Sequence, residues 1–276
     1  MARSYKIVAD SSANLKVFDN APFSMVPMKI ICEHGEHVDN MDLDVAAMVA
    51  DLKSCKGRSS TACPSIGEWL EAFGDAEEVY AFTITSHLSG SCASALEAKK
   101  MYLEAHPERQ VHVFDTLSTG PEMELLIRRT AELLAADIPF EQVVAAIEDY
   151  SHNTHLIFCL KSMNNLVKNG RVSPVLAAAT GLLGIHIIGI ASQEGELEIL
   201  HKPRGEKRTV EGCYAEMKRN GYKGGRVSIS HCLNPVAGAA LKKMILDEFP
   251  AADITLRVVT GLCCYYAEEG GWLVGF

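Results

Sequence analysis

The chain has 276 residues, of which 48% are hydrophobic and 22% charged, so it can form one large or two modest domains with a substantial core. Its formal net charge of −9 argues against nucleic-acid binding, because a nucleic-acid surface needs a basic stripe. Gly, Thr, His or Arg interrupts each long apolar stretch, so we predict no membrane span.

The first half of the chain alternates apolar, β-branched runs with amphipathic segments. We predict strands at 5–9, 25–31, 79–84 and 111–114, and helices at 43–52, 66–73, 92–101, 123–134 and 140–150. Such an alternation is typical of a mostly parallel sheet with helices on both faces, and therefore of the α/β class.

Two loops of this half are rich in hydroxyl side chains. Ser86, Ser89 and Ser91 lie between the strand at 79–84 and the next helix, and Thr61 lies just before another helix. A helix N-terminus presents unpaired N–H groups and a positive dipole end, which suit a phosphate or a carboxylate. The alternative is that these hydroxyls only cap their helices.

The pattern changes after residue 153. We predict a strand at 155–160, a short helix at 162–168, a helix after 174, a hairpin at 184–192 and 196–203, and then alternating elements at 206–219, 226–230, 235–248 and 253–259. The hairpin implies antiparallel pairing. We therefore expect an N-terminal α/β domain at 1–152 and a C-terminal α+β domain at 153–276 with a mixed or antiparallel sheet.

Nine cysteines are scattered without a C-x-x-C spacing, and most lie in apolar or helical contexts typical of core residues. We therefore expect no disulfide or zinc framework, and a cytoplasmic location. The start of the chain also lacks the apolar region of a signal peptide.

Catalytic motifs are missing from the sequence: there is no G-x-S-x-G, P-loop, G-x-G-x-x-G or H-E-x-x-H. Two enzymatic alternatives remain open. Cys63 near a helix N-terminus could act as a nucleophile with His87 as its base. His34 and His37, in a polar turn, could bind a metal, although that turn is better explained as a solvated hairpin tip.

Six motifs carry a resemblance to a known family. In chain order they are 10–15 (DSSANL), 26–30 (VPMKI), 61–65 (TACPS), 86–91 (SHLSGS), 114–118 (FDTLS) and 166–173 (LVKNGRVS). In this order and spacing the chain resembles the DegV family over essentially its whole length. The resemblance implies a non-enzymatic two-domain protein that buries one long-chain fatty acid, without a cofactor, and that presents the acid to a separate fatty acid kinase subunit.

The resemblance also assigns residues. Thr61 and Ser89 match the hydroxyls that bind the carboxylate in the family, in the same two loops chosen above for their helix N-termini. Arg171 and Arg204 resemble basic positions that face either the head group or the kinase, with surface salt bridges as the alternative.

Tyr266 stands where family members carry a histidine, and a phenol can still donate a hydrogen bond to a carboxylate. Glu268 and Glu269 replace small residues there, and Ala62-Cys63 replaces a Ser-Gln pair. We expect the two carboxylates to repel an anionic acyl phosphate, so fatty-acid binding would persist while delivery to a kinase changes.

Overall fold

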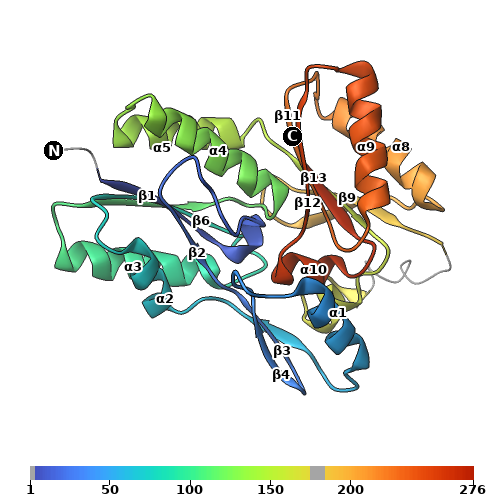
Figure 1. Cartoon of the computed structure of the whole chain (residues 1–276), viewed down its shortest axis with the longest axis horizontal. Coiled ribbons are helices and arrows are strands. Elements are labelled where there is room, and N and C mark those ends of the chain that lie inside the picture. Colours follow the sequence, from blue (N-terminus) through green and yellow to red (C-terminus); the bar gives the residue numbers. More distant parts are fainter. Residues whose placement is uncertain (1–3, 175–183) are drawn as a thin grey trace.

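The computed structural model describes residues 4–174 and 184–276 (Figure 1). Its strands form a four-stranded, a six-stranded and a three-stranded sheet. The helix expected after residue 174 falls largely on 175–183 and so lies outside the described residues. No helix in the described ranges is long and apolar enough to cross a bilayer.

The four-stranded sheet is entirely parallel, as predicted. In the order β2-β1-β6-β7, its strands are Phe23–Val26, Tyr5–Asp10, Glu78–Thr83 and Gln110–Asp115. Two helices pack on each face: α2 (Ile66–Phe73) and α3 (Ser91–Ala105) on one, α4 (Pro121–Ala135) and α5 (Phe140–Ser151) on the other. Alternate residues of β6 supply both cores, since Val79 faces α2 and α3 whereas Tyr80 faces α4 and α5.

The predicted strand at 25–31 is wrong, because the chain changes sheets within it. Pro27 has no N–H to donate to a ladder, so β2 ends at Val26. The chain then enters the antiparallel three-stranded sheet, whose strands in the order β4-β3-β5 are Gly35–Val38, Lys29–Cys32 and Ser60–Ala62. The loop expected around Thr61 is also wrong, since Thr61 pairs with Ile30 in this sheet.

The six-stranded sheet is mixed, as predicted, and only β11 and β12 pair in parallel. In sheet order its strands are β10 Leu197–His201, β9 Ile187–Ala191, β8 Leu156–Leu160, β13 Trp272–Gly275, β11 Arg226–His231 and β12 Asp253–Val258. Helices α8 (Glu206–Arg219) and α9 (Pro235–Glu248) pack on one face. Against the other lie α1 (Val45–Ser54), α6 (Asn164–Lys168) and α10 (Gly261–Ala267).

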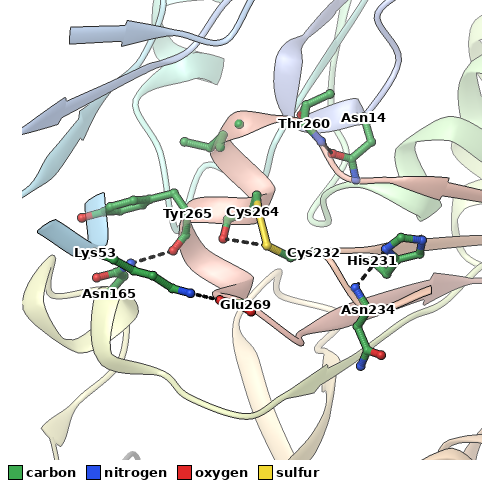
Figure 2. Close-up of a disulfide and its surroundings, with 12 residues drawn as sticks. Asn14, Lys53, Asn165, His231, Cys232, Asn234, Thr260, Cys264, Tyr265 and Glu269 are labelled. Carbon is green, nitrogen blue, oxygen red and sulfur yellow. Dashed lines mark hydrogen bonds and ion pairs between the residues drawn. A yellow bond between two sulfur atoms is a disulfide. The ribbon is translucent and has the colours of Figure 1, made fainter. Parts of the chain in front are cut away.

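Helix α10 is held by residues from the first half of the chain. Asp39 accepts hydrogen bonds from the N–H groups of Gly261 (2.7 Å) and Leu262 (2.9 Å), and so satisfies the unpaired donors of the first turn. Asn14, after the 3-10 helix η1 (Ser11–Ala13), accepts from the backbone N–H of Thr260 at 2.9 Å (Figure 2). The strands of the four-stranded sheet all precede residue 153 and those of the six-stranded sheet all follow it, but the division at 152/153 stays a prediction.

A disulfide joins Cys232, just after β11, to Cys264 in α10 (Figure 2). The expectation that the cysteines form no disulfide is therefore wrong. The two residues are 32 positions apart, and only the packing of α10 beside the end of β11 brings them together. The cytoplasmic location, which rested partly on that expectation, stays a prediction.

Candidate functional site

Residues from both halves of the chain line a cavity of about 300 Å³. Its wall is mostly aliphatic and aromatic, and the larger apolar side chains are Met28, Ile84, Leu88, Leu156, Phe158, Leu160, Leu166, Leu197, Leu262 and Leu273. Gly189, in β9, leaves room for the ring of Phe158, because a Cβ at position 189 would lie 2.1 Å from Phe158 Cζ. Such a wall favours an apolar ligand or an apolar part of one.

Two of the predicted site residues meet at the cavity wall. Thr61 Oγ1 lies 2.8 Å from the hydroxyl of Tyr266, which projects from α10. Burial raises the pKa of the Tyr266 phenol, so the group stays protonated at neutral pH. One of the two hydroxyl protons is used in the bond between them, and the other is free to donate to an anionic head group.

Ser89 and Arg171 also line the cavity. The Ser89 hydroxyl accepts from the N–H of Ser91, the first residue of α3, at 3.2 Å, and its own proton stays free to donate elsewhere. Arg171 Nε donates to the carbonyl of Leu88 at 3.1 Å, which places the guanidinium beside the Ser89 loop. The contact of Ser89 with the first residue of α3 is thus compatible with a role in ligand binding.

The Ser89 loop and the Thr61 strand are in contact although 28 residues separate them. A Cβ added at Gly90 would lie 3.3 Å from Cys63 Sγ, closer than most real Cβ contacts. Gly90 therefore allows the start of α3 to approach the residues that follow β5. This approach gathers the hydroxyls of Thr61, Ser89 and Tyr266 and the charge of Arg171 on one cavity.

Three predicted residues lie elsewhere. Ser91 is buried, and its hydroxyl donates to Asp10 at 2.7 Å. Burial raises the pKa of Asp10, while hydrogen bonds from Ser12, Ser91 and Ile84 oppose that rise. Ser86 is exposed with its N–H bonded to Asp115, and Arg204 is exposed on the surface. None of the three lines the cavity.

The two unexpected carboxylates have local partners. Glu268 accepts from the N–H of Asn165 at 3.0 Å, at the start of α6. Glu269 forms an ion pair with Lys53 of α1 (Figure 2). Neither residue belongs to the cavity wall, so their negative charge is directed at neighbouring helices rather than at the cavity.

The enzymatic alternatives gain no support from the geometry. Cys63 lines the cavity, but His87, its expected base, lies 3.7 Å from the carboxylate of Glu196. His34 and His37 both contact Asp51, at 2.6 and 2.8 Å, on the three-stranded sheet and away from the cavity wall.

Sequence reasoning missed most of the cavity wall. The run Leu156–Leu160 (LIFCL) is predicted correctly as a strand, yet nothing in it distinguishes a cavity wall from an ordinary core. Thr119 also lines the cavity, from the polar loop before α4. Its residue type was the only available signal, and hydroxyls are common in such loops.

Fold and site together define an α/β protein with a parallel sheet, a mixed sheet and a mostly apolar cavity suited to a ligand with one anionic group and an apolar body. The model of the DegV family, described as uncharacterised proteins, matches residues 4–276. The chain belongs to the DegV family.

Similar proteins have been studied as structures with bound lipids. A DegV family protein of Eubacterium eligens, loaded with heptadecanoic acid, is 39% identical, with a TM-score of 0.96 and 99% of each chain covered. The Fatty Acid Kinase (Fak) B3 protein of Streptococcus pneumoniae, loaded with linoleic acid, is 40% identical, with a TM-score of 0.97 and the same coverage. A DegV domain-containing protein of Streptococcus pneumoniae strain R6 is 40% identical over 277 residues, which cover 99% of both chains.

Proposed function

We propose that this chain binds one long-chain fatty acid, with the carboxylate at Thr61, Ser89 and Tyr266 and the tail against the apolar wall. The observation that carries the proposal is the cavity itself, because Thr61, Ser89, Thr119, Tyr266 and Arg171 line it together with aliphatic side chains. Its volume of about 300 Å³ is at the lower end of the range of about 300 to 1,000 Å³ usual for ligand pockets. Two relatives at about 40% identity carry fatty acids, which supports the same ligand class here.

The energetics favour a tightly held ligand. Each buried methylene contributes about 0.8 kcal/mol, so a sixteen-carbon tail contributes on the order of 10 kcal/mol before ordering costs. Hydrogen bonds to a charged carboxylate add roughly 1.5–3 kcal/mol each. The proposed role is binding rather than catalysis, in keeping with the family. The fatty acid is the ligand, and no cofactor is proposed.

The proposal is tested by identifying the small molecules that remain bound to the purified protein. Denaturing the protein and analysing the released small molecules by mass spectrometry should yield one long-chain fatty acid per chain. Recovery of a sugar phosphate or a nucleotide without lipid would refute the proposal.

We further propose that the loaded chain presents its fatty acid to a kinase subunit, as the name of the pneumococcal relative suggests. The two arginines would have different contacts. Arg171, in the cavity wall, contacts the head group, and the exposed Arg204 contacts the kinase.

The variant Arg204→Ala should slow phosphorylation of the bound acid without changing fatty-acid affinity. Lys207→Ala, which removes an exposed cation nearby in sequence, is the matched control. Equal turnover by both variants would remove Arg204 from the partner surface.

A further inference from the structure

Four side chains of metal-ligand type gather at one end of the three-stranded sheet. Cys32 ends β3, His34 lies in the β3–β4 turn, Asp51 lies in the last turn of α1, and Cys55 caps that helix. One ligand atom from each residue lies within 4.8 Å of the other three. Cys32 is buried and the other three are partly or fully exposed, so an ion can reach the cluster from solvent.

Two donor-to-donor distances in the cluster match a tetrahedral ion, and one must lengthen when the ion binds. Zinc lies about 2.3 Å from sulfur and about 2.0–2.1 Å from nitrogen or oxygen, so a tetrahedron places sulfur about 3.5 Å from either atom. Cys55 Sγ lies 3.4 Å from His34 Nδ1, and Cys32 Sγ lies 3.5 Å from Asp51 Oδ2. An ion would replace the 2.6 Å contact between His34 Nδ1 and Asp51 Oδ1.

Further residues orient these donors, as outer partners do in known metal sites. The Nε2 atom of His34, the ring nitrogen that does not face Asp51 and Cys55, lies 3.7 Å from Glu33 Oε1, which is ion-pair rather than hydrogen-bond distance. His37 Nε2 lies 2.8 Å from Asp51 Oδ2. Glu33 itself accepts from the N–H groups of Lys56 and Gly57, just beyond Cys55, which fixes the turn against the end of α1.

We propose that Cys32, His34, Asp51 and Cys55 bind a divalent, thiolate-preferring metal ion of the zinc type. Two sulfurs, one imidazole and one carboxylate form a donor set for zinc rather than for magnesium or calcium. Four protein ligands fill a tetrahedral shell, so the role is structural: the ion joins the β3–β4 hairpin to the end of α1. Binding deprotonates the two thiols and releases their protons to solvent.

The test is titration of the full chain with Co²⁺ alone, under a non-thiol reductant and without oxygen. We expect one equivalent to bind with a thiolate-to-cobalt charge-transfer band and the visible bands of a tetrahedral ion, and Zn²⁺ to displace it. In Cys32→Ser/Cys55→Ser, bound cobalt should fall below about one tenth of an ion per chain. Cys63→Ser, which alters another partly buried thiol, should retain the full signal.

Two further variants are expected to weaken cobalt binding without abolishing it. His37→Ala should weaken cobalt affinity about 10- to 100-fold while keeping the thiolate band, because His37 only orients Asp51. If the double cysteine variant does not fold, Asp51→Asn replaces it and should weaken binding by at least about tenfold.

Three results would overturn the proposal: cobalt binding without a thiolate band, a band that survives in a folded double variant, or a Cys32–Cys55 disulfide that the reductant does not open.

Discussion

The polar and apolar parts of the cavity are built in different ways. The polar groups come one at a time from separate elements: Thr61 from β5, Ser89 from the loop before α3, and Tyr266 from α10. Much of the apolar wall comes from neighbouring strands of one sheet, with Leu156, Phe158 and Leu160 on β8 and Leu273 on β13. Recognition of the head group thus depends on the tertiary arrangement of a few atoms, whereas the tail contributes through contact area.

This difference predicts different responses to perturbation. Removing one polar group deletes a directed interaction of roughly 1–3 kcal/mol. The apolar contribution changes in small steps of about 0.8 kcal/mol per methylene, whichever wall residue is involved.

The largest expected effect comes from shortening the ligand. Decanoic acid has six methylenes fewer than hexadecanoic acid, which corresponds to about 5 kcal/mol and a loss of affinity on the order of a thousandfold or more. Competition of both acids against a fluorescent fatty acid measures this difference. Equal affinities would mean that the wall does not enclose the tail.

Removing the disulfide tests the scaffold of the polar part. The disulfide closes a loop of about 32 residues. The variant Cys232→Ala/Cys264→Ala removes this cross-link and should lower the free energy of unfolding by about 3–4 kcal/mol. Because Cys264 lies two residues before Tyr266, fatty-acid affinity should also fall. Denaturant unfolding measures the first effect. Reductant should destabilise the native chain but leave the variant unchanged, and equal responses would show that the bond does not form in solution.

Deleting two donors tests the head-group site directly. In Thr61→Ala/Ser89→Ala a desolvated carboxylate loses two charged hydrogen bonds, so affinity should fall at least about tenfold with the fold intact. Calorimetric titration gives the affinity and circular dichroism verifies the fold. Ser86→Ala, which removes an exposed hydroxyl outside the cavity wall, is the control. If both proteins bind equally well, Thr61 and Ser89 are structural hydroxyls only.

The smallest effect is expected for the phenol. Tyr266→Phe keeps the ring and removes the hydroxyl that contacts Thr61, so affinity should fall about three- to tenfold. Tyr265→Phe is the matched control, because the Tyr265 hydroxyl bonds to Ser59 and Asn169 instead. Equal losses in both variants would attribute the effect to α10 packing rather than to the carboxylate.

Local pattern determined much of the fold. The parallel sheet, the β9–β10 hairpin and most helices follow from the periodicity of apolar residues, because each such element is specified by neighbours in sequence. A hydroxyl before a helix is a local signal too, but it fits a helix cap as well as a binding site, so Ser89 is predicted as a site residue only together with the family resemblance. Thr61 came from the resemblance and from a loop that is in fact a strand.

The tertiary structure decided the rest. Strand β13 has only four residues and its partners are far away in sequence, so no local pattern marked it as a central strand. Tyr266 meets Thr61 across 205 positions, and Cys232 meets Cys264 across 32. The sequence supplied the hydroxyls, the thiols and the apolar runs, but contact between residues distant in the chain depends on how sheets and helices pack. A cavity is made of such contacts, and it therefore exists only in the folded chain.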